Sequence, residues 1–441
     1  MPGVKKNAMK SNTQEISLVP EKDQPYPLPE GWKWVRLGSI TQIVGGGTPP
    51  SKVKEYYEGG DIPWLSPVDL SNYTDVYISR GKKMITANGL ANSSARMMPA
   101  ETVCLSSRAP IGYVAIAKNP LCTNQGFKSF LPSPFYRPRF LYWYLKGNKP
   151  LLESYASGTT FLELSGTKAA QIEFPLPPLE EQERIVTRIE SLFAKLDEAK
   201  EKAEAVLDTF ENRKAAILHK AFTGELTAKW REERGIEKER WENVTVGEIC
   251  HDVKVGIVIK PSQYYTDQNQ GTPAFRSANV RENHIGNFDC VYINNEGMTT
   301  NKRCIVHTGD VLVVRSGNLG TACVVPEEFD GYNAIDILIA VPDQSKVMSQ
   351  YLCSFTNSPL GKKSVAAGKR GMALAHFNVK GYSALPLELP TIAEQQEITR
   401  LLDSLLEKEQ KSKEAAESVL EQIDLMKKAI LAKAFRGELG N

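Results

Sequence analysis

Two stretches of the chain place apolar residues at alternating steps of three and four, the pattern of a helix with one buried stripe. Each stripe needs an apolar partner, and packing one helix on the other within the chain buries both. We therefore predict an antiparallel intrachain coiled coil; the alternative is two separate helices, each packed on its own domain. The predicted core residues are Ile185, Ile189, Leu192, Leu196, Val206, Phe210, Ile217, Ile398, Leu402, Leu405, Val419, Ile423 and Ile430.

Start and stop signals bracket both helices. Thr391 and Glu394 have the spacing of a capping box, in which each side chain bonds the backbone amide of the other residue. Gly224 and Gly437 stand where a glycine ends a helix. A helix of about 40 residues is about 60 Å long, at 1.5 Å per residue.

The remaining sequence consists of short β-branched runs, such as TVCLS, YVAIA and DVLVVR, bounded by turn residues, while PRFLYWYLKG is typical of a short helix. The predicted fold class is α/β (α+β): two mixed α/β domains separated by the two long helices. The predicted segments are an N-terminal extension (1–27), a first domain (28–176), a first helical region (177–227), a linker (228–242), a second domain (243–389) and a second helical region (390–441).

The chain also contains an internal repeat. The segment from Pro177 to Leu226 aligns without a gap on the segment from Pro390 to Leu439, and their ends read AILHKAFTGEL and AILAKAFRGEL. Weaker matches at nearly the same offset link the preceding parts, for example VRLGSI with VTVGEI. The protein is therefore two copies of one unit, each a variable globular part followed by a helix.

Composition narrows the class of protein. With 41% hydrophobic and 24% charged residues the chain is an ordinary globular protein, and its net charge of +2 permits nucleic-acid binding without demanding it. The seven cysteines are scattered and never spaced C-x-x-C, which favours buried thiols over disulfides or a zinc site. No run of about 18 apolar residues and no signal peptide is present, so we expect a soluble cytoplasmic protein that does not contact a membrane.

Motifs of catalysis are missing from the sequence. It contains no G-x-x-x-x-G-K-[ST] phosphate loop, no G-x-S-x-G elbow and no H-E-x-x-H. The [ND]-P-P-[FYW] motif of adenine methyltransferases is also missing. We therefore expect no catalytic residue, no metal and no cofactor in this chain.

Loops rich in Arg, Lys, Asn, Ser and Tyr occur in both globular parts, and such side chains suit contacts with base edges and phosphates. For any one of them an ordinary exposed side chain is an equally good interpretation. The candidate DNA-binding residues are Lys52, Lys54, Tyr56, Ser107, Arg108, Tyr264, Arg276, Asn279, Arg315, Asn318, Lys369 and Arg370.

These segments resemble the specificity (S) subunits of type I restriction-modification systems. The resemblance covers nearly the whole chain and rests on LPEGWKWVRLGSI (28–40), SSRAPIGYVAI, FPLPPLEEQERIV and the two AF-x-GEL helix ends. The second copy departs slightly, with LPLELPTIAEQQEI where the family more often has Pro-Pro-x-x-E-Q.

The resemblance implies a DNA-recognition subunit without catalysis of its own. Each globular part would be a target recognition domain that reads one half of a bipartite site in double-stranded DNA, and the helices would set the spacer. Two modification subunits, which bind S-adenosylmethionine and methylate adenine at N6, would dock on the helices, joined by restriction subunits that consume ATP. The alternatives are a free-standing DNA-binding regulator, the specificity subunit of a methylation-only system, and a two-headed scaffold that binds no DNA.

Overall fold

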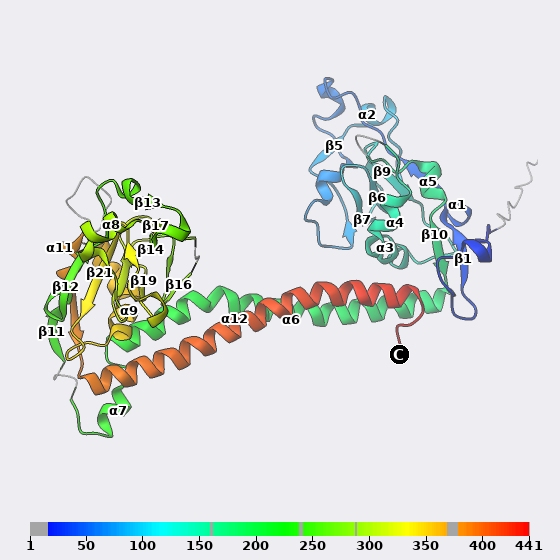
Figure 1. Cartoon of the computed structure of the whole chain (residues 1–441). Coiled ribbons are helices and arrows are strands. Elements are labelled where there is room, and N and C mark those ends of the chain that lie inside the picture. Colours follow the sequence, from blue (N-terminus) through cyan, green and yellow to red (C-terminus); the bar gives the residue numbers. More distant parts are fainter. Residues whose placement is uncertain (1–15, 159–161, 238–240, 287–288, 368–377, 441) are drawn as a thin grey trace, which may run out of the picture. The chain divides into compact units, whose positions relative to one another are not determined.

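The computed structural model describes residues 16–158, 162–237, 241–286, 289–367 and 378–440 (Figure 1). The chain divides into two compact units. Unit 1 comprises Met1–Lys202 and Val419–Asn441, and unit 2 comprises Ala203–Ser418. The division cuts both long helices, so each unit holds one mixed α/β part and one end of each helix.

The two long helices are α6 (Leu179–Phe222) and α12 (Ile392–Phe435), each of 44 residues. Gly224 and Gly437 follow them with φ values of 78° and 73°, the left-handed conformation that a glycine adopts without strain. The predicted glycine stops are therefore confirmed.

The predicted capping box is only half right. The Glu394 amide donates to the Thr391 hydroxyl at 3.4 Å. The Glu394 carboxylate does not accept the Thr391 amide, because it binds residues that follow the end of α6. These contacts are described below.

Unit 1 is built on a five-stranded sheet (Figure 1). Helix α3 (Pro138–Gly147), which the sequence predicts, packs on this sheet, and six consecutive residues of α3 from Phe140 to Leu145 are buried. Its other helices are α1 (Leu37–Ile40), α2 (Ala87–Ala91), α4 (Lys149–Ser154) and α5 (Gly166–Ala170). The five-stranded order is β2 (Ile43–Gly45), β9 (Phe127–Phe130), β6 (Val103–Ser107), β7 (Ile111–Ala117), β4 (Tyr77–Ile78); a three-stranded sheet has β5 (Lys83–Ile85), β3 (Ile62–Leu65), β8 (Cys122–Thr123), and a ribbon pairs β1 (Lys33–Arg36) with β10 (Glu173–Leu176).

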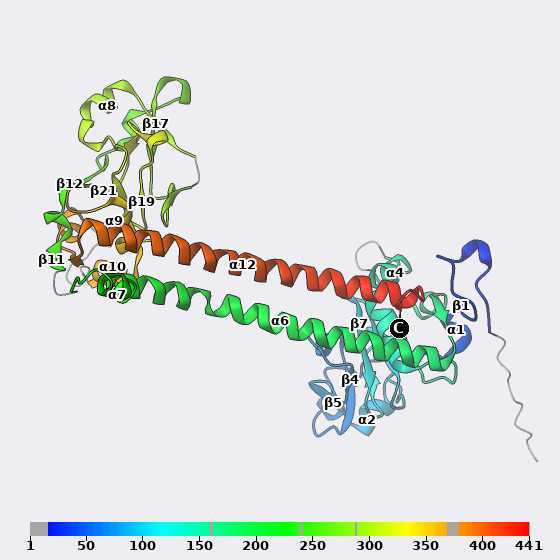
Figure 2. The same ribbon diagram turned by 90° about the horizontal axis from the view of Figure 1, so that it is seen from below.

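Unit 2 repeats this plan with two four-stranded sheets. Helix α9 (Ser349–Asn357) occupies the place of α3 and packs on the end of α6 (Figure 2). The remaining helices are α7 (Ala228–Glu232), α8 (Asn295–Thr300), α10 (Pro359–Ala367) and α11 (Val379–Ser383). The sheet orders are β12 (Cys250–Val255), β21 (Ile337–Pro342), β18 (Val311–Val314), β19 (Ala322–Val324), and β13 (Tyr265–Thr266), β17 (Val291–Ile293), β14 (Thr272–Phe275), β20 (Asn333–Ala334); β11 (Glu242–Thr245) pairs with β22 (Pro386–Leu389), and β15 (Val280–Arg281) with β16 (His284–Ile285).

Within each unit the two helix segments run antiparallel, as predicted. In unit 2, Arg213 forms an ion pair with Glu409 at 2.7 Å, and the Lys413 ammonium lies over the Phe210 ring. Residue numbers therefore rise along α6 while they fall along α12. In unit 1 the Lys427 ammonium pairs with the Asp197 carboxylate, and the ends of both helices join one core.

The apolar seam follows the predicted stripe at its ends and drifts between them. Val419 is 37% exposed, so it does not lie in the core, and the half-buried Leu420 takes the inward position. A straight helix has 3.6 residues per turn, so a strict seven-residue stripe rotates by about 20° per heptad away from its partner. Of the predicted core residues, Ile185, Ile189, Phe210, Ile398, Leu402 and Ile423 are buried, whereas Leu192, Leu196, Val206, Ile217, Leu405 and Ile430 are half-buried.

The seven cysteines are free thiols. Five are buried, and burial raises the pKa of Cys104 and Cys323 to about 12. Cys250 and Cys290 are only half-buried, unlike the prediction. Over the ranges that the structure describes, no helix has the length and apolar character needed to cross a membrane.

Candidate nucleic-acid interface

Four loops of unit 1 meet at one end of its five-stranded sheet. Backbone hydrogen bonds join them: Gly47 N–H donates to Thr123 at 2.9 Å and Ser107 N–H donates to Gly126 at 2.7 Å. Leu164 N–H donates in turn to Ser107 at 2.9 Å. We call these loops, residues 46–49, 108–110, 124–126 and 162–164, loop cluster 1.

Loop cluster 1 and the adjoining strand β9 supply two cations that share one carboxylate. The Arg108 guanidinium lies 3.8 Å and the Lys128 ammonium 3.6 Å from Glu163, and the Arg108 side chain is 38% exposed. Because one carboxylate faces two cations, the local charge is positive, as a phosphate-binding surface requires.

The equivalent loops meet in unit 2. Ile257 N–H donates to Ala334 at 2.8 Å, the counterpart of the Gly47–Thr123 bond, and Asp336 N–H donates to Ile257 at 3.1 Å. The Asp336 carboxylate lies 3.2 Å from the Arg315 guanidinium. We call residues 256–260, 315–320 and 335–336 loop cluster 2.

The Arg315 side chain is more deeply buried than that of Arg108. Its side chain is only 16% exposed, and its Nε is buried with no hydrogen-bond partner among the described residues. Asp336 has a φ of 53°, which is uncommon for a residue other than glycine. The Asp336 carboxylate thus lies beside a largely buried guanidinium, a group that can donate two parallel hydrogen bonds.

Loop cluster 2 also has an apolar tip. Val258 and Ile259 are 46% and 76% exposed, and Lys260 follows them with a φ of 42°. The equivalent positions in loop cluster 1 are Thr48 and Pro49, so the two clusters present different chemistry on the same framework.

Two candidate residues are buried. Asn279 has no exposed surface, and its side-chain oxygen accepts the Arg276 amide at 2.7 Å. Ser107 is also fully buried and accepts a hydrogen bond from Lys128 at 3.4 Å. Both residues hold loops in place and do not face solvent. Arg276 itself is 39% exposed and lies 3.8 Å from Asp289.

Tyr56 and Tyr264 occupy equivalent packing positions. The Tyr56 carbonyl accepts the Thr86 amide at 2.9 Å, and the Tyr264 carbonyl accepts the Asn294 amide at 2.9 Å. Gly89 in α2 and Gly297 in α8 stand three residues after these donors. A Cβ added at either glycine would lie 2.6 Å from an atom of the tyrosine. Both tyrosines therefore pack a turn on a short helix, a role that the repeated spacing of Thr-x-x-Gly and Asn-x-x-Gly signals in the sequence.

The remaining candidates lie in three places. Asn318 is exposed in loop cluster 2, and Lys52 and Lys54 are exposed on the segment that leads into β3, outside loop cluster 1. Lys369 and Arg370 lie outside the described residues. Of the candidate residues, the structure thus brings Arg108, Arg315 and Asn318 into the loop clusters.

A buried glutamine joins each globular part to its long helix. The Gln182 side chain accepts the Arg137 amide at 2.7 Å and donates to Phe135 at 3.1 Å. The Gln395 side chain accepts the Met348 amide and donates to Lys346, both at 2.9 Å. Sequence reasoning missed this pair, although the dipeptide Glu-Gln stands at the same place in both repeats.

The glutamate before each glutamine differs between the units. Glu394 is 1% exposed and binds Arg231 and Thr227 at 2.6 Å and the Trp241 indole at 2.9 Å. Glu181 instead pairs on the surface with Arg184 at 2.8 Å, and these hydrogen bonds lower its pKa. The start of α12 is thus covered by residues that follow α6, whereas Glu181 at the start of α6 lies in a surface ion pair.

Comparison with known proteins agrees with this architecture. The family model described as the type I restriction modification DNA specificity domain matches residues 29–207 and 238–422. The chain is 44% identical to the type I restriction enzyme MjaIX specificity subunit of Methanocaldococcus jannaschii, over 41% of this chain and 42% of that protein. It is 23% identical to the EcoKI specificity subunit of Escherichia coli, over 93% and 90% of the two chains.

Two solved structures share the fold. The HsdS subunit from Thermoanaerobacter tengcongensis superposes with a TM-score of 0.68 at 21% identity, covering 95% of this chain and all of that one. A chain from the structure described as the basis of complex assembly and conformational transition of the type I R-M system gives 0.67 at 22% identity, covering 94% and 100%. The family model covers most of the sequence in two copies, and the chain therefore belongs to the type I restriction modification DNA specificity family.

Proposed function

We propose that this chain is the DNA sequence-specificity subunit of a type I restriction-modification complex, in which each mixed α/β part reads one half of a bipartite site. The observation that carries the proposal is the pair of loop clusters. Each stands at the equivalent end of one copy of the repeat, and each carries a cation beside a carboxylate. Two similar but unequal readers suit a site with two different halves.

The two clusters would make different contacts with DNA, one with a base and the other with phosphates. Arg315 lies beside Asp336, and an arginine can donate two hydrogen bonds to the O6 and N7 atoms of guanine in the major groove. Arg108 and Lys128 share Glu163 and are less fixed, which suits contact with phosphates.

The partners follow from the same proposal. Two modification subunits would dock on the long helices and carry out adenine N6 methylation with S-adenosylmethionine, and restriction subunits that use ATP would join through them. Exposed apolar side chains on α12, Leu425 at 63% and Met426 at 48%, support a docking role for this helix. This chain would supply recognition and spacing, without a cofactor or catalysis of its own.

The test is to sequence N6-methyladenine in the host genome with this gene intact and deleted. We expect one gapped, two-part motif to lose methylation on deletion. An unchanged methylome in a host that expresses the protein would contradict the proposal.

Exchanging one globular part sharpens the test. Replacing residues 28–176 with the equivalent part of another family member should change one half of the motif and leave the other half intact. A change in both halves would refute the assignment of one half-site to each part.

A further inference from the structure

A turn of unit 1 carries three positive charges within four residues. It connects β4 to β5, and its residues 80–83 read Arg-Gly-Lys-Lys. Arg80, Lys82 and Lys83 are exposed, and in the described part of the chain none of them has an ion-pair partner. We call residues 80–83 the basic turn. Such a run of unpaired cations attracts a polyanion.

One carboxylate holds the backbone of the basic turn. Asp69 lies in the 3-10 helix η3 (Pro67–Leu70), and its Oδ1 atom accepts the Lys82 amide at 2.8 Å. Its Oδ2 atom accepts the amide and the hydroxyl of Ser66, at 2.7 and 2.8 Å. A Cβ at Gly81 would lie 2.7 Å from this Oδ2 atom, so only glycine allows the close approach. One carboxylate beside three cations leaves the local charge positive.

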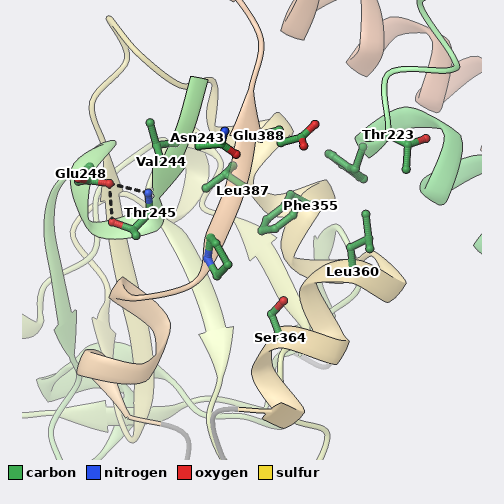
Figure 3. Close-up of a pocket in the computed structure, with 12 residues that line it drawn as sticks. Thr223, Asn243, Val244, Thr245, Glu248, Phe355, Leu360, Ser364, Leu387 and Glu388 are labelled. Carbon is green, nitrogen blue, oxygen red and sulfur yellow. Dashed lines mark hydrogen bonds between the residues drawn. The ribbon is translucent and has the colours of Figure 1, made fainter. Parts of the chain in front are cut away.

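A capping box in unit 2 shows which of these bonds is additional. Figure 3 shows it at the rim of a pocket, where the Glu248 carboxylate accepts the amide and the hydroxyl of Thr245 at 2.7 and 2.8 Å. These bonds begin the 3-10 helix η5 (Val246–Glu248) and lower the pKa of Glu248. Two hydrogen bonds thus complete such a box. The third bond of Asp69, to Lys82, has a different role, because it positions the basic turn.

The basic turn adjoins loop cluster 1 through the end of β3. The Trp64 indole donates to the Gly47 carbonyl of loop cluster 1 at 2.9 Å. A Cβ at Gly81 would lie 2.9 Å from the Trp64 carbonyl. The next residue of β3, Leu65, accepts the amide of Asn124 in loop cluster 1 at 2.8 Å. One strand end therefore contacts both the loop cluster and the basic turn.

The exposed carboxylates that precede β3 lie toward the other end of the β3–β5 ladder. Lys83 pairs with Trp64 beside the basic turn, whereas Ile85 pairs with Ile62 at the far end. The carboxylates belong to Glu55, Glu58 and Asp61. Asp61 directly precedes Ile62, and the Glu55 carbonyl accepts the Thr86 hydroxyl at 2.9 Å. The cations of the basic turn thus stand at the end that adjoins loop cluster 1.

Unit 2 has the same framework without the cations. Strands β14 and β17 pair in the register of β3 and β5, which puts Val291 in the place of Lys83. The two residues before Val291 are an aspartate and a cysteine. Asn279 takes the place of Asp69, because it accepts the amide of the residue three positions earlier in the same way. The duplicated turn is therefore basic in unit 1 alone.

We propose that the basic turn binds the phosphate backbone of DNA beside the half-site that unit 1 reads, and that unit 2 makes no equivalent contact. Exposed cations on a positioned turn suit phosphates, which recur at regular spacing along a duplex. Figures 1 and 2 agree that β5 and α2 lie on the side of unit 1 away from its own segments of α6 and α12, the helices on which modification subunits would dock. The inference rests on the proposed function and makes binding of the first half-site the more salt-dependent.

The test measures DNA binding by the complex purified with the host's modification subunits, on duplexes that carry the methylated motif. The double variant Lys82→Gln, Lys83→Gln removes two charges from the basic turn. Each phosphate contact adds about 0.9 to the slope of log affinity against log salt concentration, so we expect the slope to fall by about two. Raising the salt from about 50 to about 200 mM should then weaken the double variant roughly 10-fold less than the unmodified complex. Matched and mismatched duplexes should be affected equally, because phosphates carry no sequence information.

Ethylation of single phosphates locates the contact. Ethyl groups beside one half-site should interfere with binding of the unmodified complex and not with binding of the double variant. The other half-site should give the same interference with both proteins. The double variant Lys22→Gln, Lys33→Gln removes two charges from exposed lysines of unit 1 outside the basic turn and is the matched control. It should leave the salt slope and the interference pattern unchanged.

An unchanged slope and interference pattern in the Lys82→Gln, Lys83→Gln variant would overturn the inference and leave the proposed function intact. The same holds if this variant loses the modification subunit during purification, since the basic turn would then bind protein. An equal loss of slope in the control variant would also overturn it, because net charge alone would explain the effect. Failure of the unmodified complex to prefer the gapped motif would overturn both the inference and the proposed function.

Discussion

Loop clusters 1 and 2 begin at equivalent strands, yet they hold their cations differently. Arg108 is 38% exposed and shares Glu163 with Lys128, whereas Arg315 is 16% exposed and, among the described residues, pairs with Asp336 alone. A side chain that is fixed before binding loses less conformational entropy when a ligand arrives. The comparison teaches that duplicated frameworks can present one exposed and one largely buried cation.

A contrast between a buried and an exposed ion pair recurs at the helix starts and predicts the largest effect. Glu394→Ala should lower the free energy of unfolding by about 3–5 kcal/mol, because it leaves the buried Arg231 without its carboxylate. Glu181→Ala removes an exposed pair and should cost under about 1 kcal/mol. Urea denaturation of both variants measures the difference, and equal losses would show that the Glu394 cluster contributes no more than a surface pair.

Arg315→Ala should weaken binding of the cognate site by about 1–3 kcal/mol and relax the preference for one base in one half-site. Arg108→Ala should weaken binding of all sequences evenly and reduce the salt dependence by about one counterion. Titrations of the complex with matched and mismatched duplexes at several salt concentrations separate the two. Arg303→Ala, which removes an 82% exposed guanidinium, is the control. Loss of base preference with Arg108→Ala would show that Arg108 contacts a base and would contradict its assignment to phosphates.

The carboxylates should have opposite effects. Asp336→Asn keeps a residue that tolerates the left-handed backbone but removes the charge that orients Arg315, and should cost about 1 kcal/mol of specific binding. Glu163→Gln frees two cations and should strengthen binding of non-specific DNA. The ratio of specific to non-specific affinity measures both, and a stronger specific complex with Asp336→Asn would argue against an orienting role.

The smallest effect is expected at the apolar tip. Ile259→Ser should change the free energy of unfolding by under about 0.5 kcal/mol, because the side chain is 76% exposed. Any change in DNA affinity should be confined to the second half-site. Thermal unfolding checks the first expectation, and a marked destabilisation would mean that this tip is covered in solution.

Periodicity predicts the long helices well, because their contacts recur every three or four residues. Ile185, Ile189, Ile398 and Leu402 are buried as the stripe requires. The middle of the stripe is less predictable, and Val419 is exposed because the straight helix drifts from a seven-residue period.

The candidate interface was less accessible to sequence reasoning. Asn279 and Ser107 have side chains typical of base contacts, but both are buried: Asn279 accepts the amide of Arg276 within its own turn, and Ser107 bonds Lys128 of another strand. No motif in the sequence marks Asp336 as a candidate, because its role depends on its ion pair with Arg315 of another loop. Such pairings are set by tertiary structure, and one sequence does not display them.

The division of both helices between the units has a consequence for synthesis of the chain. Unit 2 is one continuous stretch, Ala203–Ser418, so it can complete its contacts as soon as that stretch has left the ribosome. The core of unit 1 includes Leu431, Ala434 and Phe435, which are made more than two hundred residues after its α6 segment. We therefore expect unit 1, although most of it is translated before unit 2, to fold after unit 2. Its apolar face stays exposed until the last turns of α12 have been synthesised.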